Sequence, residues 1–140
     1  MIDAALNSSG AQVILATSND ENYPPENIID GSSETFWVST GMFPQEFIIR
    51  FSNPVKVSLV TLQCYNVKHL KIEKSASNEA ADFEAVIEKE FEHTEGQLQS
   101  NDIAFSGTRA THLKFIIQSG YDHFVSVHRV MVEGTSESHM

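Results

Sequence analysis

A segment rich in side-chain oxygen atoms, YPPENIIDGSSETFW, runs from Tyr23 to Trp37. The residues in it that carry such oxygens are Asn27, Asp30, Ser32, Ser33, Glu34 and Thr35. Calcium binds roughly six to eight hard oxygen ligands, drawn from carboxylates, amides and backbone carbonyls. The segment is therefore a candidate calcium loop. The alternative is that Asn27 and Asp30 satisfy backbone amides of a turn and that nothing binds there.

Histidines offer a second possible centre of chemistry. Asp122 and His123 are adjacent, and His128 follows in the next apolar run. Such a group suggests an acid–base pair or a zinc site, but no second ligand pair such as C-x-x-C accompanies it. We therefore predict packed or surface histidines. The chain also lacks a G-x-S-x-G elbow, an H-E-x-x-H motif and a phosphate-binding glycine loop, so no enzymatic activity is predicted.

The elements that must position these residues are predicted to be strands. Apolar and polar residues alternate with period two, which is typical of half-buried strands. In residues 46–51, Phe47, Ile49 and Phe51 share one face, and Glu46 and Arg50 are expected to face water.

A second clear run covers residues 111–118, where Leu113, Phe115 and Ile117 share one face, opposite His112 and Lys114. The same alternation occurs in residues 12–16, 57–65, 69–76, 97–105 and 124–134. Turn residues predict breaks at Ser52–Pro54, Ser106–Gly107 and Ser119–Gly120. Seven or eight short strands of this kind predict an all-β fold, a sandwich or jelly roll.

The segment from residue 80 to 91 can be interpreted in two ways. Phe83, Ile87 and Phe91 are spaced as on a helix face, but they also alternate with glutamates. We predict a strand because the neighbouring segments are strands. The acids between Glu79 and Glu95 are interpreted as a solvated face that protects a sheet edge, the alternative being a docking patch for a basic partner.

Composition restricts the possible partners. The chain has 140 residues and a formal net charge of −10, with only 9 Lys and Arg, so nucleic acid is not expected as a partner. No apolar run approaches the roughly 18 residues of a membrane span, and the N-terminus lacks the features of a secretory signal. The lone Cys64 is expected to be a buried thiol in a reducing, intracellular protein. We predict one domain over residues 1–135 and a flexible tail over residues 136–140.

The segment ENIIDGSSETFW resembles the entry loop of the galactose-binding-like, or discoidin-type, jelly rolls, with the pattern N-x-x-D-G-x-x-x-T-x-W. The resemblance implies a jelly-roll β-sandwich with a structural calcium ion (Ca2+) in this loop. It also implies the ligands: the carbonyl of Asn27, the carboxylate of Asp30, the hydroxyl or carbonyl of Thr35, and Glu133 as an acidic residue that closes the site.

A closer resemblance is carried by VILATS, PPENIIDG, ETFW, TGMFPQEFII, LKIEKS, HTEGQLQ, FII and DHFVSVH, in this order. Together they are similar to the family of twenty-five-kilodalton subunits of intraflagellar transport complex B, which was once grouped with small heat-shock proteins. The tail lacks the I-x-I/V motif of heat-shock domains. The resemblance implies a non-enzymatic binding subunit, cytoplasmic and ciliary, that pairs with a Rab-like small GTPase subunit for ciliary cargo transport.

The alternative function is a calcium-dependent carbohydrate-binding, lectin-like module. Sugar binding usually needs exposed aromatic residues at loop tips, and Trp37 is expected to pack in the core instead. Met42 and Phe43 suggest an apolar tip, which fits a protein partner better than anionic lipid, given the net charge. We therefore expect no membrane insertion and no strong small-molecule ligand.

Overall fold

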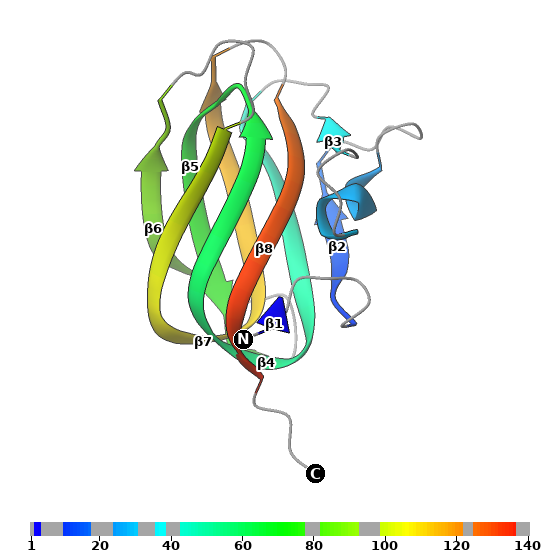
Figure 1. Cartoon of the computed structure of the whole chain (residues 1–140), viewed down its shortest axis with the longest axis vertical. Coiled ribbons are helices and arrows are strands. Elements are labelled where there is room, and N and C mark those ends of the chain that lie inside the picture. The colour runs from blue at the N-terminus through cyan, green and yellow to red at the C-terminus, as the bar shows by residue number, and fades with distance from the viewer. Residues whose placement is uncertain are drawn as a thin grey trace.

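Strands that alternate apolar and polar residues build almost all of the described structure, a computed structural model shown in Figure 1. It describes residues 2–3, 10–17, 24–30, 36–38, 43–77, 82–92, 99–121 and 125–136. The elements are β1 (Ile2–Asp3), β2 (Gln12–Ala16), the 3₁₀ helix η2 (Pro25–Ile29), β3 (Trp37–Val38), β4 (Gln45–Tyr65), β5 (Val67–Ser75), β6 (Glu84–Glu90), β7 (Gln99–Gly120) and β8 (Ser126–Ser136).

The described strands form one curled antiparallel sheet in the order β1-β8-β4-β7-β5-β6, with β2 added to β4 and β3 added to β8. β4 and β7 pair along nearly their whole length, and β4 changes its other partner halfway. Residues 47–50 of β4 pair with β2, whereas residues 55–65 pair with β8. The long pair therefore belongs to both faces of the curled sheet (Figure 1), and the predicted jelly roll is confirmed.

Two of the predicted breaks are irregularities inside long strands and not strand ends. The β4–β7 register shifts between Arg50 and Val55, and β7 continues through Gly107, whose φ of 75° is left-handed. Strand bulges increase the local bend and twist, so they let one strand pass from one face of the fold to the other. The third predicted break is confirmed, since β7 ends at Gly120.

The core lies between the two faces of the curled sheet. Phe47, Ile49 and Leu113 have no exposed surface, and the rings of Phe47 and Phe115 stack at 4.9 Å. Trp37 is also fully buried and meets Phe47 edge to face at 5.5 Å, so its predicted packing role is confirmed. Each such side chain contributes about 1.5–3 kcal/mol through its burial.

The ambiguous segment is a strand, as predicted, because β6 pairs with β5 along Glu84–Glu90. Its alternation is irregular because the register shifts opposite Ile72 and Glu73, so that Val86 and Ile87 are both partly buried. At the other end of the chain, β8 extends to Ser136, so strand structure crosses the boundary predicted at residue 135. Among the described residues, no helix is long and apolar enough to cross a membrane.

Candidate functional site

Two buried isoleucines fix the helix η2 to the core, and the first residues of the candidate calcium loop belong to this helix. Pro24 is extended, and Pro25 occupies the start of the helix, where its missing N–H costs nothing. Ile28 and Ile29 are 0% and 2% exposed, so the helix is fixed to the core. Asp30 follows as the C-terminal cap in a right-handed conformation. Local sequence thus determines where Asn27 and Asp30 lie.

Asn27, near the start of the loop, forms a hydrogen bond with Phe36, near its end. Its side-chain amide donates a hydrogen bond to the carbonyl of Phe36 at 3.0 Å, and its backbone N–H donates to Pro24 at 3.1 Å. The segment between Asp30 and Phe36 is therefore closed at its base. The Asp30 carboxylate and the backbone carbonyls of η2 are oxygen ligands of the kind that calcium takes.

Of the two remaining predicted calcium ligands, the structure describes one. Thr35 lies outside the described residues. Glu133 is half-buried on β8, opposite Asp3 of β1 and Leu59 of β4, and its carbonyl accepts a hydrogen bond from the Ser58 hydroxyl at 3.1 Å. In the described part of the chain, no three His, Cys, Asp or Glu residues gather as a metal-binding group. The full ligand set stays a prediction.

The exit of the loop is anchored on β8 by aromatic contacts. Phe36 stacks on the ring of His128 at 4.8 Å, and Tyr65 meets the same ring edge to face at 5.2 Å. His128 is thus a packed residue, which agrees with its structural interpretation. Asp122 and His123, its suggested companions, lie outside the described residues.

Cys64 is a buried, unreactive thiol, as expected. It is 0% exposed, and burial raises its pKa to about 12. Its neighbour Gln99, which sequence patterns did not single out, is a buried junction. The Gln99 amide donates to the carbonyls of Val67 and Glu92 at 3.1 and 2.9 Å and accepts from the Val67 N–H at 3.1 Å. It therefore joins the starts of β5 and β7.

Phe43 is not a protruding apolar tip. It is half-buried and packs against the core. A Cβ atom added to Gly120 would approach the Phe43 ring to 2.8 Å and the Asn66 carbonyl to 2.7 Å, so glycine allows the ring to lie there. Met42 lies outside the described residues. The idea of a Met42–Phe43 docking tip therefore loses support at Phe43.

The acidic residues of β6 lie on a terminal strand of the sheet (Figure 1). Glu84, Glu88 and Glu90 are exposed. Glu84 lies 4.0 Å from the Lys74 ammonium, and Glu88 lies 3.7 Å from the His69 ring nitrogen. Exposed pairs of this kind contribute little to stability, about 0–1 kcal/mol. Their exposed position on a terminal strand fits either interpretation, a solvated face that protects a sheet edge or a docking patch for a basic partner.

His112 is buried, although it lies on the strand face opposite Leu113. The imidazole is 2% exposed, and its Nδ1 lies 2.9 Å from the Thr111 hydroxyl. The Phe83 ring covers it edge to face at 6.4 Å. Residues distant in sequence cover this part of the outer face, which strand periodicity alone does not reveal.

Comparison with solved structures supports the fold. A family 32 carbohydrate-binding module from C. perfringens NanJ, in complex with galactose, superimposes with a TM-score of 0.78 at 19% identity, covering 93% of this chain and 97% of that one. A putative chitobiase fragment from Bacteroides thetaiotaomicron gives 0.84 at 16% identity, covering 96% and 95%. At such identities the likeness concerns the fold alone.

The family model for the F5/8 type C domain matches residues 13–130, which defines the class of this jelly roll. Relatives named intraflagellar transport protein 25 homolog are 58% identical in Homo sapiens, over 99% of this chain and 96% of the relative, and 53% identical in Mus musculus, over 98% and 96%. Intraflagellar transport protein 25 of Chlamydomonas reinhardtii is 41% identical, over 96% and 70%. The chain belongs to the intraflagellar transport protein 25 family, whose members are named for transport, a non-enzymatic role in cilia.

Proposed function

We propose that this protein is a non-enzymatic binding subunit of the intraflagellar transport B complex, acting in the cytoplasm and the cilium, that pairs with a Rab-like small GTPase subunit. The observation that carries the proposal is the 58% identity to the human relative across 99% of this chain. Any nucleotide chemistry belongs to the GTPase, and this chain supplies a rigid docking surface.

The acidic edge of β6 is the described surface that we assign to docking. Glu84, Glu88 and Glu90 are exposed there, on a strand whose only described partner is β5. A partner with a basic strip gains electrostatic steering from such an edge. A stable interface usually buries about 1,200–2,000 Å² in total, so further surface must contribute.

We assign a structural calcium ion to the loop after η2, with the Asn27 carbonyl, the Asp30 carboxylate and Thr35 as ligands and Glu133 as a fourth contributor. The Asn27–Phe36 hydrogen bond supports this assignment because it closes the base of the loop. A bound divalent ion neutralises the carboxylate and braces the loop.

Mixing the purified chain with the Rab-like subunit of the same species tests the pairing. Size-exclusion chromatography with light scattering at micromolar concentration should give one peak with the mass of a one-to-one complex. Two separate peaks, with the GTPase loaded with either nucleotide, would contradict the pairing. The charge-reversed variant Glu88→Lys should slow association at low salt, whereas Lys56→Glu, on an exposed part of β4, should not.

A second function, calcium-dependent carbohydrate binding, is favoured by one observation. The module in complex with galactose shares this fold with a TM-score of 0.78. A glycan array distinguishes the two functions. A specific, calcium-dependent ligand at micromolar affinity would favour the lectin function, and a blank array beside a stable GTPase complex would favour the transport function.

A further inference from the structure

A small pocket of about 90 Å³ lies beside the bulge of β4. The residues that line it are Arg50, Phe51, Ser52, Asn53, Pro54, Thr111 and His112. The ladder between β4 and β7 is interrupted after Arg50 and resumes at Val55, so the intervening residues turn away from their partner strand. The pocket therefore owes its existence to the bulge.

The described lining of this pocket contains hydrogen-bond donors and a positive charge but no carboxylate. Arg50 is exposed at its mouth, while His112 and Thr111 are 2% and 8% exposed. Arg50 and His112 are directly opposite in the β4–β7 register, so their side chains emerge as neighbours. In a chain with a net charge of −10, this is a locally basic cavity.

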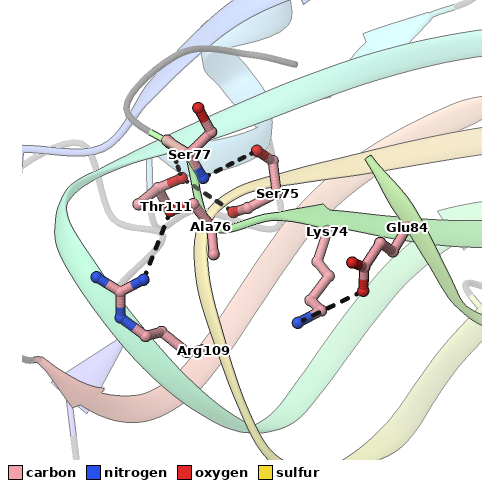
Figure 2. A network of polar contacts seen from close by, with 7 residues as sticks. All are labelled: Lys74, Ser75, Ala76, Ser77, Glu84, Arg109 and Thr111. Atoms are coloured by element: carbon pink, nitrogen blue, oxygen red, sulfur yellow. Dashed lines mark hydrogen bonds and ion pairs between the residues drawn. The ribbon is translucent and has the colours of Figure 1, made fainter. Parts of the chain in front are cut away.

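Two acids on the adjoining strands β5 and β6 are paired with lysines. Glu73 of β5 lies 3.4 Å from Lys71 and 3.9 Å from Lys114. Glu84 of β6 lies 4.0 Å from Lys74 (Figure 2).

A hydrogen-bond network influences which nitrogen of His112 carries the proton. The Thr111 hydroxyl donates toward the carbonyls of Ser75, at 2.9 Å, and Ser77 (Figure 2). A hydroxyl has one hydrogen, so while it points to a carbonyl its lone pairs face Nδ1 of His112, an arrangement that favours the tautomer with the proton on Nδ1. In that tautomer Nε2 is left without a proton in the neutral ring and becomes a donor only when the ring is charged.

We infer that this pocket binds a single phosphate-sized oxyanion between the Arg50 guanidinium and the His112 imidazole. Arginine matches tetrahedral and planar oxyanions with parallel N–H bonds, and charge-assisted hydrogen bonds are about twice as strong as neutral ones. The volume of the pocket, about 90 Å³, is enough for one such group. This site is separate from the calcium loop and does not depend on the GTPase pairing.

Anion binding at this pocket is coupled to protonation of His112. Burial, and then the Arg50 charge, lower the pKa of His112. Arg50 is the charged group that acts on it from β4, whereas β5 presents the neutral Ser75 opposite it and the Phe83 ring covers it. A bound anion offsets both causes. It should raise the pKa of His112 and bind more tightly as the ring becomes charged.

NMR titration of the ring signals of His112 in the full chain tests this inference. Inorganic phosphate should shift these signals saturably and raise the pKa of His112, and chloride at matched ionic strength should not. Acetate in a parallel arm separates carboxylate from phosphate recognition. Arg50→Gln should weaken phosphate binding about tenfold or more, since it removes a charge-assisted contact.

Arg50→Gln should also raise the pKa of His112 without phosphate and abolish the further rise with phosphate. Lys56→Gln removes the same charge from an exposed position of β4 outside the pocket and serves as the matched control. Equal phosphate shifts in wild type and Arg50→Gln, or equal shifts with chloride, would overturn the inference. Melting curves of both variants establish that each is folded.

Discussion

The loop after η2 and the pocket beside the β4 bulge are two polar regions of opposite character. The first gathers oxygens of Asn27 and Asp30 within a few residues of sequence, on a helix fixed by Ile28 and Ile29. The second gathers nitrogens from Arg50 and His112, which lie far apart in the chain. One offers ligands to a cation, and the other offers donors to an anion.

The difference concerns how each region is held in place. Contiguous residues form the loop, and core packing at Ile28, Ile29 and Trp37 fixes its ends. The pocket instead depends on strand register, because Arg50 meets His112 only if β4 and β7 pair as they do. The loop should therefore respond most to lost packing or metal, and the pocket to lost hydrogen bonds or a change in pH.

Removing the anchor of the loop should have the largest effect. Trp37→Ala deletes a fully buried ring that contacts Phe47, and we expect it to lower the free energy of unfolding by about 3–5 kcal/mol. Urea denaturation measures the loss. Ile14→Ala, at a side chain 41% exposed, is the control and should change stability by less than about 0.5 kcal/mol. Similar losses in both variants would contradict the anchoring role of Trp37.

Calcium should come next in magnitude. A ligand that binds only the folded state adds about 2.7 kcal/mol at a concentration 100 times its Kd, so calcium should raise the Tm. Asp30→Asn should abolish this rise, and Glu84→Gln, at an exposed acid of β6, should preserve it. Differential scanning calorimetry with calcium and with chelator gives the comparison. A wild-type melting curve that is the same with calcium and with chelator would contradict the proposed calcium site.

Removing a hydrogen bond beside the pocket should change the free energy of unfolding somewhat less than calcium does. Thr111→Val keeps the shape but leaves the Ser75 and Ser77 carbonyls without the hydroxyl donor, at a cost of about 1–3 kcal/mol. Thr61→Val, which removes an exposed hydroxyl bonded to Asp102 at 2.8 Å, is the control, with a cost of less than about 1 kcal/mol. Chemical denaturation of both variants measures the free energy of unfolding. A larger loss of stability in Thr61→Val than in Thr111→Val would contradict this prediction.

The smallest effect should be the pH dependence due to His112. The pKa of His112 in the folded chain is lowered from the ordinary histidine value of 6.5, so the unfolded chain binds more protons between these two values. Stability should thus fall as the pH decreases from about 7.5 to about 5.5. Arg50→Gln removes one cause of the lowered pKa and should make the decrease shallower. Lys56→Gln should keep the wild-type slope, and an equal slope in all three proteins would exclude His112 as the source.

Local patterns of residue types are enough to predict the class of the fold and the place of the oxygen-rich loop in the chain. Alternation at Phe47, Ile49, Leu113 and Phe115 predicts the buried faces, because a strand places every second side chain on one side. Asn27 and Asp30 are close in sequence, so their proximity in space is a local property that the pattern itself contains.

The form of the predicted breaks and the place of the basic pocket depend instead on contacts between distant strands. Turn residues at Ser52–Pro54 are compatible with a strand end or with a bulge, and the choice depends on whether the partner strand continues beside them, as β7 does. His112 looks like a surface residue by alternation, but Phe83 and the bulge cover it. Burial of this kind depends on contacts between distant segments, and no local pattern encodes them.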